Sequence, residues 1–324
     1  MSDSLDRAMP PLEPGDLEPY YVAPPLPRQD RVWLHIVLFL MTVVTTTLVG
    51  ALHYWGFTQG FNADAVVFPD FRDPSLYLNG LWYSATVLGI LGCHEMGHYV
   101  ACRYYRVDAS LPFFLPAPLP LTGTLGAFIR IRDRIPSKVA LFDIGLSGPI
   151  AGFLVAVPAL VMGLTLSATE QLPADFTGLE LGEPLLFRFA SWLVWGDLPD
   201  GVSINMHPMA FAAWFGLLAT ALNLFPIGQL DGGHVAYAVL GRGSALLTLL
   251  MVCVAIGLTI FSMSWLIWTI LMVVMLAVMG PHHPPTLDDD MQMDRTRLIL
   301  AVVGLVMLII CFTPAPIEPF VTGQ

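Results

Sequence analysis

The stretch GILGCHEMGHYVACRYY, residues 89–105, joins an apolar helical run to a set of ionisable side chains. It contains the pattern H-E-x-x-H as His94, Glu95 and His98. Residues four apart lie on one face of a helix, so both imidazoles can reach one ion while Glu95 points toward the open side of that ion. Ionisable groups inside a membrane helix are costly and usually mark function. We therefore interpret the pattern as a metal site rather than as buried structural hydrogen bonds.

The composition of the whole chain predicts an all-α polytopic membrane protein. Of its 324 residues, 56% are hydrophobic and 12% are charged, and the mean hydropathy is +0.69. Soluble domains carry about 25% charged residues, roughly twice as many. A net charge of −11 excludes a nucleic-acid partner, and the composition excludes an ordinary soluble enzyme and a disordered protein.

About seven transmembrane helices are expected, because a span needs roughly 20 apolar residues. The apolar stretches are 33–54, 77–104, 139–166, 207–225, 244–262, 264–280 and 298–313. A tight turn near Ser262–Ser264 is predicted to divide the long run 246–280. The stretch 185–195 is too short to cross. Placing the N-terminus in the cytoplasm puts 12 of the 14 basic residues on the cytoplasmic side, which favours that orientation.

The chain is predicted to contain one folded domain. Residues 1–32 are rich in proline and acid and predict a flexible cytoplasmic tail. Residues 33–313 form the membrane-embedded domain, with a catalytic core at about 77–241, and residues 314–324 form a short tail. Acidic residues stand where a signal or transit peptide would be basic, which favours a bacterial inner membrane over an organelle.

A third metal ligand is expected in NLFPIGQLDGGH, residues 223–234. Asp231 is the best candidate, since a catalytic zinc site needs three protein ligands and an open position. Pro226, Gly232 and Gly233 must interrupt the helix, and irregular backbone at membrane depth is tolerated only beside a cavity or inside protein. The alternative for Asp231 is a helix cap among glycines.

Three motifs together resemble the site-2 protease family of intramembrane zinc metalloproteases. They are HEMGH at 94–98, SGPIAG at 147–152 and NLFPIGQLDGG at 223–233, in that order. The chain is similar to a minimal member without a PDZ or cystathionine-synthase-like domain. Many members have a proline where this chain has Gly228.

The resemblance implies the roles of the residues at the site. One Zn²⁺ per chain would be held by His94, His98 and Asp231, and Glu95 would be the general base. Asn223 would lie beside the site and help to hold the substrate.

Other small residues and prolines are expected to support the site structurally. In the third predicted span, Gly148 and Gly152 flank Pro149 in a small-xxx-small pattern that allows close helix packing. Pro226, Gly232 and Gly233 would shape the interruption before and after Asp231.

The stretch LTGTLGAFIRIR, residues 121–132, predicts a strand or hairpin from its alternation and its two glycines. The resemblance implies a membrane-embedded hairpin beside the zinc, whose free edge could pair with an extended substrate. The candidate substrate-binding residues there are Gly123, Thr124, Gly126, Ala127 and Phe128. The alternative is a surface hairpin whose arginines bind lipid headgroups. The preceding residues 111–121 are interpreted as an interfacial segment.

The expected function is an intramembrane zinc metalloendopeptidase that cuts transmembrane segments, with regulated intramembrane proteolysis as the role that the resemblance implies. Its expected partners are the lipid bilayer and single-span membrane proteins already cut by another protease. The alternatives are a catalytically silent membrane chaperone or binding protein and a metal-ion transporter. His234 could support the site or lie at the interface, and His282 with His283 could form a second metal site.

Overall fold

The computed structural model describes residues 30–61, 68–280 and 283–321. The elements below belong to the compact unit Arg31–Gln324. The tail predicted at residues 1–32 therefore lies almost wholly outside the described residues.

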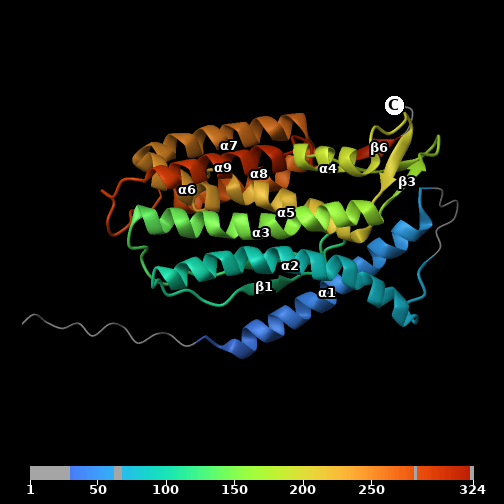
Figure 1. Ribbon diagram of the computed structural model, residues 1–324, viewed down its shortest axis with the longest axis horizontal. Helices are drawn as coiled ribbons and strands as arrows, with labels where there is room; N and C mark the ends of the chain where they lie inside the picture. The colour runs from blue at the N-terminus through green and yellow to red at the C-terminus, as the bar shows by residue number, and fades with distance from the viewer. Residues whose placement is uncertain (1–29, 62–67, 281–282, 322–324) are drawn as a thin grey trace, which may run out of the picture. The chain divides into compact units, whose positions relative to one another are not determined.

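The described chain is mainly helical (Figure 1). Its helices are α1 (Val32–Gln59), α2 (Pro74–Tyr104), α3 (Lys138–Leu166), α4 (Leu185–Trp195), α5 (Pro208–Leu224), α6 (Asp231–Leu240), α7 (Ser244–Phe261), α8 (Leu266–Met279) and α9 (Arg295–Cys311), with the 3-10 turns η1 (Gly241–Gly243) and η2 (Met263–Trp265). Each of the seven predicted apolar stretches forms a helix, and α7 and α8 meet at the predicted turn.

Within the described residues, four helical segments are long and apolar enough to cross a membrane by themselves. They are Val32–Gln59, Pro74–Tyr104, Lys138–Leu166 and Asp231–Phe261, the last of which combines α6, η1 and α7. Shorter apolar helices account for the remaining stretches. A multi-span membrane protein is therefore supported, and the count of seven crossings stays a prediction.

Local sequence explains where the central helices begin and end. The Asp73 carboxylate accepts a hydrogen bond from the Ser75 amide and caps α2, whose first residue is a proline. Ser137 caps α3 by accepting from the Ala140 amide at 3.2 Å. Helix α5 ends at Leu224, since Pro226 favours an extended backbone at Phe225, with φ −58° and ψ 128°.

The helices α2, α3 and α5 form the centre of the unit, and α1 crosses α2 at an angle (Figure 1). The crossing is close because two glycines meet there: a Cβ added to Gly50 would lie 2.3 Å from the carbonyl oxygen of Gly80. A buried hydrogen bond of 2.7 Å joins Thr46 to Ser84 beside it. Tyr83 and Trp214 are among the largest side chains buried in the core.

The described strands form three two-stranded antiparallel sheets. They pair β1 (Phe113–Pro116) with β2 (Thr124–Phe128), β3 (Ala168–Gln171) with β5 (Val202–Asn205), and β4 (Thr177–Leu181) with β6 (Ile317–Val321). The hairpin predicted near 121–132 is present. Within the segment 111–121, Phe113–Pro116 is the partner strand of that hairpin, and the interfacial position of the segment stays a prediction.

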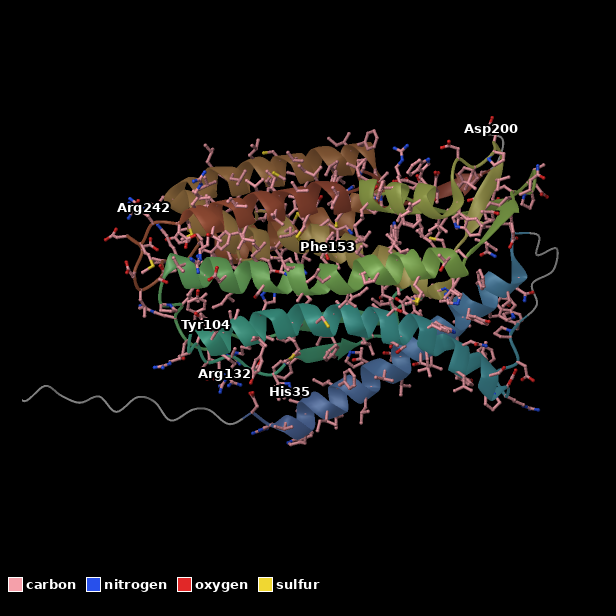
Figure 2. The ribbon with its side chains drawn as sticks, viewed as in Figure 1. His35, Tyr104, Arg132, Phe153, Asp200 and Arg242 are labelled. Carbon is pink, nitrogen blue, oxygen red and sulfur yellow. The ribbon has the colours of Figure 1, made fainter. Side chains whose placement is uncertain are left out.

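Two of the sheets were not predicted, and together with α4 they form what we call the cap. The cap comprises β3, β4, α4 and β5, which follow α3 in the chain, and β6, which comes from the predicted tail 314–324. It gathers at one end of the bundle, where Asp200 is seen (Figure 2). Tyr104, Arg132 and Arg242 lie toward the opposite end.

Candidate metal centre

Helix α2 carries His94, Glu95 and His98, which are all buried at 6–7% exposure. The two imidazoles lie on one face of the helix, with their Nε2 atoms 3.1 Å apart. The H-E-x-x-H spacing therefore brings two nitrogen donors to one point, as the sequence predicted.

Asp231, the first residue of α6, supplies a third donor at the same point. Its Oδ2 lies 3.1 Å from His94 Nε2 and 3.3 Å from His98 Nε2. Within the described residues, His94, His98 and Asp231 are the one group of three or more His, Cys, Asp or Glu side chains whose donor atoms lie close enough together to hold one metal ion. Ligands about 2.0–2.2 Å from a tetrahedral zinc lie roughly 3.3–3.6 Å apart, close to the separations of these donor atoms, so the donor set fits zinc.

The proton on one imidazole is placed by its neighbour. His98 Nδ1 lies 2.7 Å from the carbonyl oxygen of Ile144 in α3. A carbonyl only accepts hydrogen bonds, so Nδ1 carries the proton and the lone pair of Nε2 faces the other two donors. Such an outer hydrogen bond orients a metal-binding histidine and fixes its tautomer.

The glycines of α3 give the histidine rings the room they need. A Cβ added to Gly148 would lie 2.1 Å from His98 Nε2, and one added to Gly152 would lie 3.2 Å from the Cβ of His94. Pro149 is buried between them within the helix. The predicted supporting role of this segment thus has a specific form at Gly148, because any side chain there would occupy the position of a donor ring.

The interruption between α5 and α6 turns the chain so that Asp231 enters the site. A Cβ on Gly232 would lie 2.0 Å from the Leu224 carbonyl oxygen, and one on Gly233 would lie 2.2 Å from the Gly228 carbonyl oxygen. Gly228 itself has φ +54°, which a proline ring cannot adopt. The glycine at this position, where many family members have a proline, therefore allows a backbone conformation that a proline would not.

Asn223, near the end of α5, also reaches the donor cluster. Its Nδ2 lies 3.4 Å from His94 Nε2, and the side chain is half-buried. The amide is therefore at the place that the family resemblance implied for it.

The β1–β2 hairpin packs between α1 and α2 beside this cluster. Phe114 of β1 faces Gly92 of α2, where an added Cβ would lie 3.6 Å from the ring. Directly after β2, the backbone of Ile129 lies near the Glu95 carboxylate. Because the strand reaches the predicted base through its backbone, the hairpin is part of the site's surroundings.

The predicted substrate-binding residues occupy different positions in this hairpin. Thr124 is buried and donates to the Leu115 carbonyl oxygen at 2.8 Å, while Gly123, at φ +68°, packs against the backbone of α1. Gly126 has φ +101°, Ala127 pairs with Phe114, and Phe128 is exposed. Thr124 and Gly123 therefore anchor the hairpin, whereas Leu125 and Phe128 are exposed to another chain.

A contact between two further histidines was not predicted. His234 Nδ1 in α6 lies 2.7 Å from His283 Nε2, and the His283 ring stacks on Tyr237. His282 lies outside the described residues. The sequence offered no signal for this pairing, because 49 residues separate the partners.

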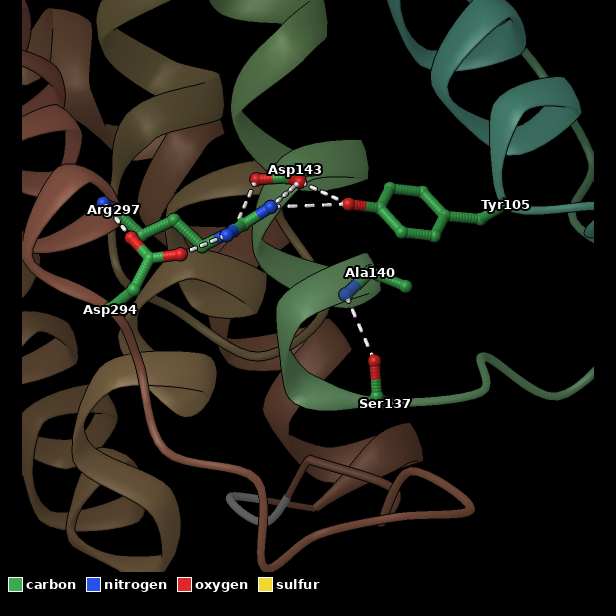
Figure 3. A network of polar contacts seen from close by, with 6 residues as sticks. All are labelled: Tyr105, Ser137, Ala140, Asp143, Asp294 and Arg297. Atoms are coloured by element: carbon green, nitrogen blue, oxygen red, sulfur yellow. Dashed lines mark hydrogen bonds and ion pairs between the residues drawn. The ribbon is translucent and has the colours of Figure 1, made fainter.

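A polar network also escaped the sequence reasoning (Figure 3). Asp143 of α3 accepts hydrogen bonds from Tyr105, after α2, and from Arg297 of α9, whose guanidinium also pairs with Asp294. Burial, reinforced by the hydrogen bond to Asp143, raises the pKa of Tyr105 to about 12. The network ties α9 to the ends of α2 and α3.

A helical membrane unit with two buried histidines, a partly buried aspartate and an adjacent glutamate at one point defines a class of membrane-embedded metalloprotein. The sequence pattern of peptidase family M50 matches residues 82–263, more than half of the chain. The chain therefore belongs to peptidase family M50, the site-2 protease family that its motifs resemble.

Several curated plant proteins are similar to this chain. The probable zinc metalloprotease EGY2, chloroplastic, of Oryza sativa subsp. indica is 28% identical over 255 residues, 77% of this chain and 46% of the relative. The probable zinc metalloprotease EGY1, chloroplastic, of Arabidopsis thaliana is 28% identical over 236 residues, 70% of this chain and 42% of the relative. The probable zinc metalloprotease EGY3, chloroplastic, of Oryza sativa subsp. japonica is 30% identical over 247 residues, 69% of this chain and 41% of the relative. The chain thus spans less than half the length of these relatives. No solved structure gives a significant match.

Proposed function

We propose that this protein is a zinc-dependent endopeptidase that cuts transmembrane segments of other membrane proteins. The observation that carries the proposal is the convergence of His94, His98 and Asp231, with Glu95 next to the first donor, inside an apolar helical bundle. Family membership and the names of the relatives support zinc as the ion.

The proposed mechanism assigns separate tasks to the residues present. When bound, zinc would supply the Lewis acidity that activates water and the scissile carbonyl group. Glu95 accepts the proton of the attacking water and returns it to the nitrogen of the leaving amine. Asn223 offers a donor beside the cluster for the substrate backbone.

The substrate must be extended where it is cut, because a helix hides its own peptide bonds. The hairpin offers a partner for the freed backbone groups next to Glu95. We therefore propose strand pairing with the hairpin as the way in which substrate is held. The buried position of Thr124 and the contact with α1 support this role over that of a surface hairpin for lipid.

Single-span proteins already cut by another protease are the proposed substrates, in regulated intramembrane proteolysis. The support for this finer statement is the family resemblance. Location in a bacterial inner membrane and a cytoplasmic N-terminus are also proposals. The relatives named above are chloroplastic. Reporter fusions at the two chain ends and within 283–294 test the orientation.

The silent chaperone and the metal-ion transporter are less well supported alternatives. A silent scaffold would not need Glu95 beside a complete donor set. A transporter needs polar groups along a path through several spans, whereas the donor set lies at one point in the bundle.

The deciding experiment compares the wild type with Glu95→Gln in detergent, using a single-span model substrate. The substitution keeps the shape of the side chain and removes the base. We expect zinc content to be unchanged and cleavage to fall by a factor on the order of 100 or more. Undiminished cleavage by this variant would falsify the proposed mechanism.

A further inference from the structure

A half-open cavity lies at the cap, and the proposed chemistry does not use it. Its volume is about 350 Å³, within the range of about 300–1,000 Å³ that ligand pockets occupy. Its apolar walls include Phe61, Phe176, Leu179, Phe187, Trp214 and Phe320. These side chains come from a residue just after α1, from the stretch 176–187, from α5 and from β6, so the cavity forms only where distant parts of the chain meet.

Carboxylates stand at the edge of this cavity. Glu180 and Glu183 line it, and both also line an adjoining space of about 620 Å³ together with Glu318. Glu180 and Glu318 are direct partners in the β4–β6 ladder, where like charges facing each other are unfavourable. Among the described residues that line these two spaces, Arg188 is the one cation, and it lies 3.8 Å from Glu183. The local charge therefore favours a positively charged ligand.

The cavity is remote from the metal along the bundle. Gly148 and Gly152 of α3 touch the donor histidines, whereas the cap begins directly after Leu166, where α3 ends. From these glycines to Leu166 the helix rises about 21–27 Å at 1.5 Å per residue. A helical substrate segment lying beside α3 would cover this distance with about 14–18 residues.

We propose that the cap is an exosite for the part of a substrate that extends beyond its membrane segment. The cavity takes one apolar side chain, and the carboxylates take an adjacent positive charge, either a basic side chain or a free α-amine. This inference rests on the proposed protease function and adds a substrate class to it. A lipid is disfavoured as the occupant, because an anionic headgroup would meet Glu180 and Glu318.

Binding at the cap has a consequence for the place of cleavage. If the end of the substrate is held there, the metal faces a peptide bond about 14–18 helical residues further along. Cleavage position is then measured from the cap and not from the membrane surface. Lengthening the substrate between its held residue and its membrane segment should move the cut toward the cap end of the segment by the number of residues inserted.

The test uses the full chain carrying Glu95→Gln for binding and the otherwise wild-type chain for cleavage. The binding probes are fluorescent peptides with the central pair Arg-Phe, Asp-Phe or Ser-Ser. A further pair of Phe-containing peptides differs only in having a free or an acetylated N-terminus. Glu180→Lys reverses the charge at the cavity and can pair with Glu318. Asp200→Lys makes the same charge change on an exposed residue of the cap that does not line the cavity.

We expect Arg-Phe to bind more tightly than Asp-Phe and Ser-Ser, and Glu180→Lys to weaken it by a factor of roughly three to ten. Leu179→Ser, which alters the apolar wall, should weaken the binding of the Arg-Phe peptide and of the Phe-containing peptide with a free N-terminus. Asp200→Lys should leave all affinities nearly unchanged. Tighter binding of the free than of the acetylated N-terminus would identify an α-amine as a ligand; dependence on Arg alone would identify a basic side chain.

In cleavage, Glu180→Lys should raise the KM for a substrate with an Arg-Phe stub, leave kcat unchanged and spare the Ser-Ser substrate. Equal affinity of all peptides, or equal weakening by Glu180→Lys and Asp200→Lys, would overturn the exosite. If the cleavage site does not shift when residues are inserted, the claim that its position is set by the distance from the cap is overturned. The binding result does not depend on catalysis, so failure of the protease proposal would be seen separately, as absent Glu95-dependent cleavage of every substrate.

Discussion

The two ends of the helical unit are packed in opposite ways. At the metal end, Gly148 of α3 lies against His98 with no space for a Cβ, and Gly152 leaves little space beside His94. At the cap end, two small sheets and α4 line a half-open cavity of about 350 Å³ together with Phe61 and Trp214. The difference indicates that the first end is built to hold a few atoms in fixed positions, and that the second can accept part of another molecule. Substitutions should therefore abolish metal binding at one end and alter substrate preference at the other.

The largest effect is expected from adding one methyl group at Gly148. In Gly148→Ala the new Cβ would lie 2.1 Å from His98 Nε2, so the ring must leave its position. We expect metal affinity to fall by roughly 10- to 100-fold or more, measured by zinc content after dialysis against a chelator. Gly56→Ala is the matched control, because Gly56 lies in α1 with open space around its Cβ position. Comparable zinc loss in both variants would remove the contrast between tight and open packing.

A smaller effect is expected at the hairpin. Ala127→Pro removes a backbone donor and disturbs the edge without touching a donor atom of the metal site. Zinc should stay bound, and cleavage of a transmembrane substrate should fall on the order of tenfold or more, since misplacement of the substrate is costly. Small unstructured peptides should be affected less, because they need no help to unwind. Ala127→Val keeps the donor and serves as control; equal losses on both kinds of substrate would favour a hairpin for lipid.

The turn before Asp231 gives a test of stability. Gly228→Pro forces a φ near −65° onto a residue at +54°, which should cost about 1–3 kcal/mol in unfolding free energy in detergent. Gly228→Asn is the control, since asparagine tolerates a positive φ. If the proline variant is as stable as the asparagine variant, the backbone of the turn does not have a positive φ at residue 228.

The smallest effect concerns the network at the end of α2. Tyr105→Phe removes a hydrogen bond to Asp143 and should cost about 1 kcal/mol at neutral pH. Because the pKa of Tyr105 is raised from 10.0 to about 12, its contribution is complete below pH 10 and is lost as the pH rises toward 12. The difference in unfolding free energy between wild type and variant should therefore shrink over that window. A constant difference would mean that the phenol is not held in its neutral form.

The metal end could be predicted from sequence because its signals are local. His94 and His98 are one helical turn apart, and Asp231 stands among residues that must end a helix. The cap could not be predicted, since β4 pairs with a strand at the far end of the chain and neither strand has a strong pattern of its own. The same holds for Phe113–Pro116, where prolines concealed a strand, and for His234 with His283. Pairing between distant segments depends on how the helices pack, and no spacing rule in the sequence reports it.

The most direct test of the central claim is the zinc content of the purified protein and of Asp231→Ala. The account predicts about one zinc per chain in the wild type and a small residual fraction in the variant, because two imidazoles without the carboxylate leave the site one ligand short. The variant should remain folded, as judged by its helical content in detergent. Full zinc occupancy in folded Asp231→Ala would contradict the claim that His94, His98 and Asp231 together form the metal centre.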